Sequence, residues 1–433
     1  MSAYRRSFVA QVLTGSTIAF ASSGWAQGAA PGNVPTDHYT HPGSERAAHE
    51  RIEPSKLAGG FTPVVHLRTY YLDGESLSGA EQASWAIGGW AGLRSPWWGD
   101  IFQVGFVGYT SQKLYGPDDK DGARLLAPGQ NAINVFGEAY ASLRVLDQTV
   151  TAYRQMIHRP FINAQDSRMV PNTFEAYTLT GAVQNVHYAG GYITKIKQRN
   201  SNNFEWMSTA AGGTGSHKGT VFAGATWDYV KHGFVRADAQ FTDDVYNTFY
   251  ADGKFPIAID SRTLLTLATQ YIRQKSTGAA QIGRFSTQAA GVQAAVDHGP
   301  FGAQVMYTQT SGGFDTQNPY GDHPSYLYLM QSSFNGAGEK AWGVGGHVNF
   351  AALGVPGLTA AAVYASGHDR INGGTGAAVP DRNEFNVRAD YAFAKGTVLE
   401  GLVATLRYSA LHQDGAQQTA PQFRALLNYA VRF

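Results

Sequence analysis

Alternation of apolar and polar side chains over segments of roughly ten residues is the feature that most restricts how this chain can fold. The final segment shows it most clearly. One face carries Phe423, Ala425, Leu427, Tyr429, Val431 and Phe433, and the other carries Gln422, Arg424, Asn428 and Arg432. Successive side chains of a β-strand point to opposite faces, so this segment predicts a strand with one apolar face. A terminal aromatic residue on that face is typical of outer-membrane barrels, although a soluble edge strand can end in the same way.

The same alternation places charged side chains on a single face of several earlier segments. These include residues 65–71, 235–241, 385–393 and 402–409. In a transmembrane barrel the charged face must line the lumen, because Arg or Lys on the lipid side of the bilayer midplane costs roughly 2–4 kcal/mol. The alternative is a soluble β-sandwich, whose solvated face would carry the same charges.

Composition agrees with a barrel and narrows the other classes. The chain has 51 glycines, 23 tyrosines and 23 phenylalanines, which are common in barrel strands, turns and interfacial aromatic girdles. It has no cysteine, so disulfides and thiolate metal sites are excluded. The net charge of +1 provides no general field for nucleic acid. Beyond the first 26 residues there is no apolar run of about eighteen residues, which excludes a transmembrane helix but leaves transmembrane strands.

The N-terminal residues have the pattern of a secretory signal peptide. Two arginines precede a modestly apolar stretch, and small residues on either side of Trp25 suit a signal peptidase. We expect a signal peptide at residues 1–26, a flexible extension rich in Pro, Gly and His at residues 27–60, and a transmembrane barrel at residues 61–433. This organisation predicts export and excludes a cytosolic enzyme.

Turn signals divide the expected barrel into about eighteen strands, and barrels of that size leave an aqueous lumen. The predicted strands are residues 62–72, 83–93, 100–110, 132–144, 148–156, 173–186, 189–198, 203–211, 218–228, 232–242, 262–272, 285–296, 300–309, 341–351, 357–366, 384–393, 400–409 and 422–433. Residues 243–250 are open to interpretation as a further strand or as part of one. The fold class predicted is therefore all-β, an antiparallel transmembrane barrel.

The connection at residues 156–173 has an unusual composition. An even strand number and a periplasmic N-terminus make it the third connection on the outer side. It contains two prolines, and its charged residues, with the one just before it, are Arg154, His158, Arg159, Asp166 and Arg168. In wide barrels such a loop can fold inward and narrow the pore, so we expect an inward-folded third outer loop. The alternative is an ordinary exposed loop.

Two segments of the sequence resemble a known family. Residues 166–175, beginning Asp166-Ser167-Arg168, are similar to the "DSRxxPxTFEG" segment of the OprD family of outer-membrane porins, with Ala176 in place of the usual glycine. Residues 334–342 and 350–359 resemble the same family's "FANAGEKSW…FAALGxPGLT" block. Weaker similarity occurs at residues 67–71, 387–393, 400–402 and 406–408.

The resemblance implies an 18-stranded channel whose third outer loop forms a constriction and which takes up small carboxylate-bearing nutrients by diffusion. A row of inward basic residues, called a basic ladder, would guide the carboxylate. Guanidinium forks bind carboxylates bidentately, and several weak stations permit both capture and release.

The candidate site residues follow from matching these features to the sequence. Ladder candidates supported by both alternation and the family match are Arg68, Arg388 and Arg407, and those supported by alternation alone are Arg424 and Arg236. Constriction candidates are Asp166, Ser167 and Arg168. The alternatives are lumen arginines that are only solvated or are paired with an acid such as Asp390 or Asp238, and a structural pair that holds the loop closed.

The sequence also departs from the family pattern. Gly345-Gly346-His347 stands where an arginine-tyrosine pair is usual, and Val363 stands where many members carry arginine. Two ladder stations are therefore expected to be missing, which predicts a wider or less anion-selective pore for aromatic or bulky acids.

Other functions find less support in the sequence. An outer-membrane hydrolase would need catalytic chemistry, but there is no Gly-x-Ser-x-Gly, His-Glu-x-x-His or phosphate-cradling loop, and Ser216-His217 lie in a glycine-rich turn. A non-specific porin or an adhesive barrel using residues 111–131 and 310–340 stays open. We expect no enzyme activity, no cofactor and no metal. The expected partners are small solutes, outer-membrane lipid and lipopolysaccharide, with the chain a monomer or a loose trimer in the outer membrane of a Gram-negative bacterium.

Overall fold

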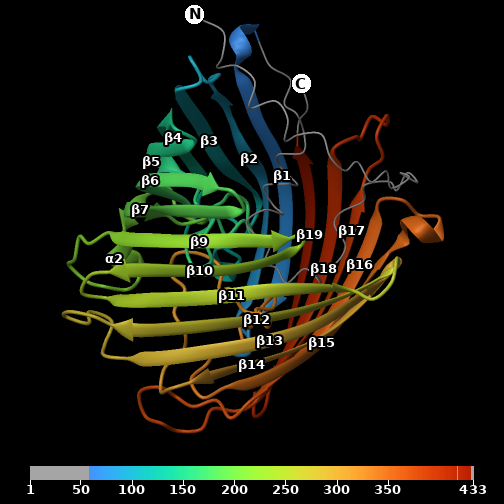
Figure 1. Ribbon diagram of the computed structural model, residues 1–433. Helices are drawn as coiled ribbons and strands as arrows, with labels where there is room; N and C mark the ends of the chain where they lie inside the picture. Colours follow the sequence, from blue (N-terminus) through green and yellow to red (C-terminus); the bar gives the residue numbers. More distant parts are fainter. Residues whose placement is uncertain (1–57, 417, 431–433) are drawn as a thin grey trace, which may run out of the picture. The chain divides into compact units, whose positions relative to one another are not determined.

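A closed ring of antiparallel strands dominates the computed structural model, which describes residues 58–416 and 418–430 (Figure 1). Each strand pairs with its neighbours in the ring, and β1 (Thr62–Glu75) pairs with β19 (Ala420–Ala430), which closes the sheet. Closure leaves no strand of the described ring with an unpaired edge, as a strand-built wall in a membrane requires. The predicted antiparallel barrel is therefore confirmed.

The remaining elements of the described chain are short or lie within the same sheet. The other strands are β2 Glu81–Arg94, β3 Phe102–Tyr115, β4 Ile133–Val145, β5 Gln148–Gln155, β6 Thr173–Val183, β7 Val186–Lys197, β8 Phe204–Trp206, β9 Thr220–Val230, β10 Gly233–Thr242, β11 Tyr246–Ala258, β12 Thr263–Ser276, β13 Ser286–His298, β14 Phe301–Ser311, β15 Lys340–Asn349, β16 Leu358–His368, β17 Arg382–Ala392 and β18 Leu402–Gln413. The helical turns are η1 Ala58–Gly60, η2 Asp118–Lys120, α2 Met207–Ala210 and η3 Phe350–Leu353. None of the described helices is long and apolar enough to cross a membrane.

Eighteen of the described strands form the ring, and β8 lies outside it. β8 has three residues and pairs only with the end of β7, while β9 pairs with β7 directly. The predicted spanning strand at residues 203–211 was wrong, because α2 follows β8 at once. β11 was missing from the eighteen predicted strands, since Asp252-Gly253 and Pro256 imitate a turn within it. The two errors offset each other, so the predicted number of strands still agrees.

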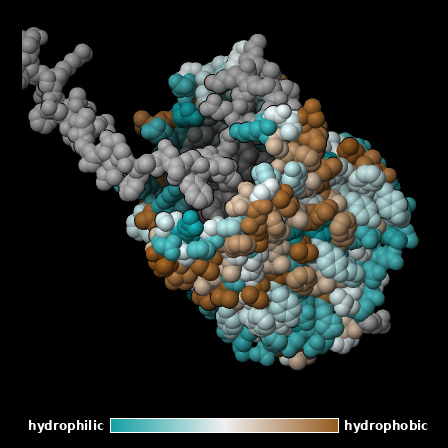
Figure 2. Space-filling model, turned by 90° about the vertical axis from the view of Figure 1, so that its right-hand side faces the viewer, coloured by the Kyte–Doolittle hydropathy of each residue, from teal (hydrophilic) through white to brown (hydrophobic). Residues whose placement is uncertain are grey.

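The two faces of the wall differ as the alternation predicts. Large apolar side chains are exposed on the outer face, among them Leu67, Phe106, Phe136, Tyr177 and Val292. Figure 2 shows apolar residues, in brown, gathered over one side of this wall. Their neighbours in sequence, such as Arg68 and Gln293, turn into the barrel, and so does Glu138, after the register shift that follows Phe136. An apolar outer face with polar groups inside is the arrangement that a lipid surround favours.

Connections at the two ends of the barrel differ in length. At one end several are two-residue turns, such as Leu146-Asp147, whose φ angles of 49° and 64° match the type I′ turn that suits twisted strands. At the other end lie the long connections at residues 116–132, 156–172, 198–219 and 312–339. Short turns face the periplasm in outer-membrane barrels, so the long connections are the outer loops.

The third and seventh of these outer loops fold into the lumen, where parts of the second and fourth pack against them. In the third outer loop (residues 156–172), Ile162, Met169 and Val170 are buried. In the seventh outer loop (residues 312–339), buried residues include Tyr320, Leu327, Leu329 and Phe334. Inward folding of the third loop was predicted. The same behaviour of the seventh was not, because only its length had been recognised.

Three sequence predictions fall outside this description. The signal peptide and nearly all of the extension before residue 58 lie outside the described residues, as does Phe433. These expectations stay predictions.

Candidate solute channel

The third outer loop is held against the wall by Arg68 of β1. Its Nη1 donates to Asp166 Oδ1 at 2.6 Å and its Nη2 to Asp166 Oδ2 at 3.1 Å. Nη1 also donates to the carbonyl of Arg168, and Nε donates to Asn428 Oδ1 at 2.5 Å. Only 6% of the Arg68 side chain is exposed. This ladder candidate and this constriction candidate therefore lie together, in a bidentate pair that positions the loop.

Ser167 and Arg168 bring further cations to the same place. Arg199, just after β7, donates from Nη1 to Ser167 Oγ, and Arg168 Nε donates to the Ala123 carbonyl at 2.8 Å. Burial, with the guanidinium groups of Arg424 and Arg199 nearby, holds the pKa of Arg168 well below its usual range. Burial also lowers the pKa of Arg199. The constriction thus concentrates positive charge in a poorly solvated place.

The seventh outer loop is anchored to β17 and β19. Arg424 Nη2 donates to the Met330 carbonyl at 2.9 Å. The backbone amides of Gln331 and Ser332 donate to the Glu384 carboxylate at 2.9 and 2.7 Å. Sequence reasoning missed Glu384, although its inward position on β17 was available from the alternation.

The third and seventh loops also contact each other. The Asn163 amide donates to the Tyr320 carbonyl at 3.2 Å, and the Asp322 amide donates to Asn163 Oδ1 at 2.8 Å. The ring of Phe161 meets His323 edge to face at 5.6 Å between centroids. The two loops therefore form one connected structure inside the barrel, which narrows the lumen.

Three ladder candidates stand side by side on neighbouring strands. Arg388 of β17 lies opposite Arg407 of β18, and Arg407 lies opposite Arg424 of β19. We call these three residues the arginine row. Arg388 is also paired with Asp390 of its own strand, with contacts of 2.5 and 2.8 Å. The alternation predicted the face of each arginine, but their shared register is a finding of the structure.

Arg236 lies apart from this row, on β10. Its Nε and Nη2 donate to the two oxygens of Asp252 on β11 at 2.8 and 2.7 Å, and 1% of its side chain is exposed. Beside it, Arg159 of the third loop donates to Asp238 at 2.6 Å. We call this part of β10 and β11, with its two Arg–Asp pairs, the paired wall.

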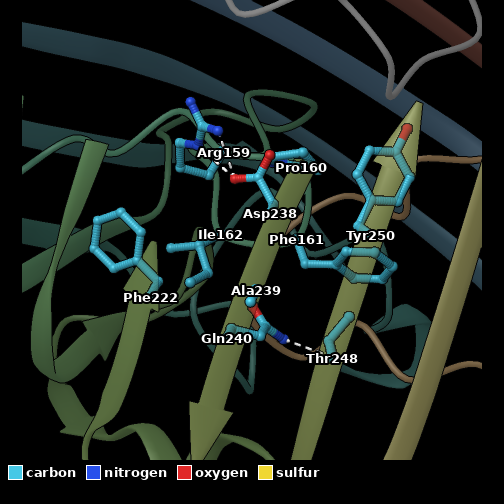
Figure 3. Close-up of a pocket in the computed structure, with 10 residues that line it drawn as sticks. All are labelled: Arg159, Pro160, Phe161, Ile162, Phe222, Asp238, Ala239, Gln240, Thr248 and Tyr250. Atoms are coloured by element: carbon cyan, nitrogen blue, oxygen red, sulfur yellow. Dashed lines mark hydrogen bonds and ion pairs between the residues drawn. The ribbon is translucent and has the colours of Figure 1, made fainter. Parts of the chain in front are cut away.

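A small pocket lies where the third loop meets the paired wall (Figure 3). Phe161 and Ile162 from the loop, and Phe222, Gln240 and Tyr250 from the strands, surround it. The Arg159–Asp238 pair spans one side (Figure 3). Apolar packing and one ion pair thus fix the tip of the loop. Within the described part of the chain, no group of His, Cys, Asp and Glu is placed to hold a metal ion.

A closed transmembrane barrel whose lumen is lined by charge and narrowed by loops from its outer end defines an outer-membrane channel. Residues 59–433 match the family described as "outer membrane porin, OprD family", and the chain belongs to that family. It is therefore a porin of the bacterial outer membrane and not an enzyme. The predicted resemblance is confirmed.

Proteins of similar sequence and solved structures of similar fold agree with this assignment. The chain is 27% identical over 326 residues to porin D of Pseudomonas aeruginosa, which covers 70% of this chain and 72% of that protein. The fold is similar to Acinetobacter baumannii OccAB3, with a TM-score of 0.80, 17% identity, and coverage of 86% of this chain and 99% of that one. It is also similar to Pseudomonas aeruginosa OpdK solved with vanillate, with a TM-score of 0.75, 19% identity, and coverage of 86% and 98%. At these identities the structural comparisons show the fold.

Proposed function

We propose that this porin is selective for small carboxylates, which lumen arginines guide through the barrel. The observation that carries the proposal is the arginine row, in which three cations occupy directly opposite positions on β17, β18 and β19. Like charges in such positions destabilise a sheet. Since this arrangement makes the sheet less stable, we infer that it serves the passage of an anionic solute through the barrel.

The spacing of the row suits a travelling carboxylate. Side chains directly opposite on neighbouring strands have Cβ atoms about 4.5–5.5 Å apart, so a carboxylate at Arg407 lies within reach of Arg388. Arg424 is 1% exposed beneath the seventh outer loop and adds its charge from behind that contact. Barrel strands tilt by about 35–45°, so a row across the strands runs obliquely down the lumen. Successive guanidinium groups therefore form successive stations.

Partners within the protein weaken two of the stations. Arg388 shares its charge with Asp390, and Arg424 donates to the Gln422 side chain at 2.8 Å and to the seventh loop. Conduction requires binding that permits release, and partly compensated arginines satisfy that requirement. The fold relative OpdK, solved with vanillate, supports an acid of this kind.

The other candidates take supporting parts in this proposal. Asp166, Ser167 and Arg168 shape the constriction, with Arg68 as both clamp and first basic contact. Arg236, which is paired with Asp252, stabilises the barrel wall and does not bind solute in this proposal. A non-specific porin is the second candidate, favoured by the acids that compensate Arg68 and Arg388.

Current block by carboxylates in planar bilayers tests the proposal. Acetate and benzoate are titrated against single channels of the wild type and of Arg407→Gln, which removes the central station. Since a hydrogen bond to a charged group contributes about 1.5–3 kcal/mol, the half-blocking concentration should rise about tenfold or more. Arg273→Gln removes an exposed arginine from β12 and should leave block unchanged. Equal block in all three proteins would favour the non-specific porin.

A further inference from the structure

We propose that His347 is a further station for anions, which continues the arginine row toward the periplasmic end and makes the channel's anion preference depend on pH. The inference rests on the proposed function, because it extends the same path. Its basis is a register that runs across seven strands of the described barrel.

The row does not stop at Arg388. Arg388 lies opposite Ala361 of β16, and Ala361 lies opposite His347 of β15. His347 is therefore in the same oblique row, two strands farther on, and close to Asn349, where β15 ends at the periplasmic side. The small side chain of Ala361 leaves the space between the two basic groups open.

Beyond His347 the row ends on an acid. His347 lies opposite Gly302 of β14, which lies opposite Asp297 of β13. A Cβ on Gly302 would overlap the His347 ring, so the glycine allows the imidazole to extend across β14. His347 Nε2 then lies 3.4 Å from Asp297 Oδ1. A basic ring and a carboxylate thus meet at the foot of the row.

Charged groups approach His347 from several strands. Asp297 approaches from β13, and Lys254 of β11 attracts Asp297. β17 contributes Arg388 with Asp390, whereas β14 and β16 contribute a glycine and an alanine opposite the ring. The His347 side chain is 20% exposed and that of Asp297 is 11% exposed, so the pair is not sealed from the lumen.

Histidine gives this station a property that the arginines lack. Imidazole changes charge between pH 5 and 8, whereas guanidinium stays charged. A protonated imidazole adds a cation at the periplasmic end of the row, and a neutral imidazole leaves only the arginines. Acidification should therefore favour anions over cations.

Reversal potentials in a potassium chloride gradient measure this preference directly. For the purified full-length mature protein in planar bilayers, we expect the anion-to-cation permeability ratio to rise about fourfold from pH 7.5 to 5.5. In water, one unit positive charge roughly 10 Å from the ion path favours an anion about twofold and disfavours a cation about twofold, and the ratio combines the two effects. His347→Gln should abolish the rise, and His347→Arg should give the higher ratio at both pH values.

A matched control and a second variant make the result decisive. His298→Gln removes an exposed histidine directly after Asp297 and should preserve the rise. Asp297→Asn removes the neighbouring negative charge and should raise the anion-to-cation permeability ratio at both pH values. A rise that survives in His347→Gln, or an unchanged ratio in Asp297→Asn, would overturn the inference.

The outcome separates this inference from the proposed function. An anion preference at pH 7.5 that falls in Arg407→Gln, together with no effect of His347→Gln on the pH response, would refute the His347 station alone. A preference unaffected by Arg407→Gln would refute the carboxylate path, whatever His347 does.

Discussion

The paired wall and the arginine row both turn arginines into one lumen, but they treat the charge in opposite ways. In the paired wall Arg236 faces Asp252 of the neighbouring strand β11, and Arg159 of the third outer loop faces Asp238 of β10. In the row, Arg407 has an arginine opposite it on both sides. The first arrangement pairs each arginine with an acid, and the second brings like charges together, which we propose that a solute carboxylate compensates. An inward arginine is therefore informative only together with its cross-strand neighbours.

The largest effect is expected when the aspartate that pairs with Arg236 is removed from the paired wall. Asp252→Ala leaves Arg236 buried without its bidentate partner, which should lower the free energy of unfolding by about 3–5 kcal/mol. Urea denaturation followed by heat-modifiable gel mobility measures the loss. Asp228→Ala removes an exposed acid, 45% accessible and near His187, and should cost about 1 kcal/mol or less. Equal effects of the two variants would mean that the paired wall is not structural.

Asp166→Asn tests whether Arg68 holds the third outer loop in place, as the arginines of the paired wall do, or binds solute, as we propose for the arginine row. The change weakens the bidentate clamp on the third outer loop, and a hydrogen bond between charged groups contributes about 1.5–3 kcal/mol. We expect the loop to leave the lumen more often, with larger and noisier single-channel currents. Asp119→Asn, in the exposed part of the second outer loop, should leave the currents unchanged. If Asp166→Asn instead changes only carboxylate block, Arg68 belongs with the row.

Acid should loosen the contact between the two inward loops. Burial lowers the pKa of His323 to about 3, whereas an exposed histidine titrates near 6.5. The exposed state therefore binds more protons between these values, and the stabilisation from neutral His323 is complete above pH 6.5 and lost as pH falls toward 3. At pH 5 the loss is about 2 kcal/mol.

Single-channel conductance as a function of pH tests this loss. Conductance should increase below pH 5 in the wild type and stay constant in His323→Gln, which carries no proton to gain. His412→Gln, an exposed site at the outer end of β18, should behave like the wild type. An acid response retained in His323→Gln would place the pH sensitivity elsewhere.

The sequence predicted which way these side chains point, but it did not predict which residues lie opposite them on neighbouring strands. A strand has a period of two residues, so the inward faces of Arg68, Arg388 and Arg424 followed from local alternation alone. The register between β17 and β18 depends on residues 393–401, whose path no alternation specifies. For that reason the arginine row could not be recognised before the structure.

The sequence also could not predict the burial of a loop where that burial depends on contacts with residues far away in the chain. The seventh outer loop folds inward because Glu384 and Arg424, from strands later in the chain, satisfy its backbone. No local pattern in residues 312–339 reports those partners. The third loop was predictable because its prolines and charges, and its family motif, lie within the loop itself.

The smallest expected effect gives the finest test of the contrast between the two walls. Asp390 forms an ion pair with Arg388 and accepts a hydrogen bond from Thr405 at 2.6 Å, so it tempers the row without enclosing it. Asp390→Asn keeps the shape and removes one negative charge, which should raise the anion-to-cation permeability ratio about fourfold, because a unit charge roughly 10 Å away in water changes the permeation of anion and cation about twofold each, in opposite directions. Asp381→Asn, a 43% exposed acid beside His368, should leave the ratio unchanged in reversal-potential measurements. A loss of stability like that of Asp252→Ala, with no change in selectivity, would show that Arg388 is held in the same way as Arg236 and would reduce the row to Arg407 and Arg424.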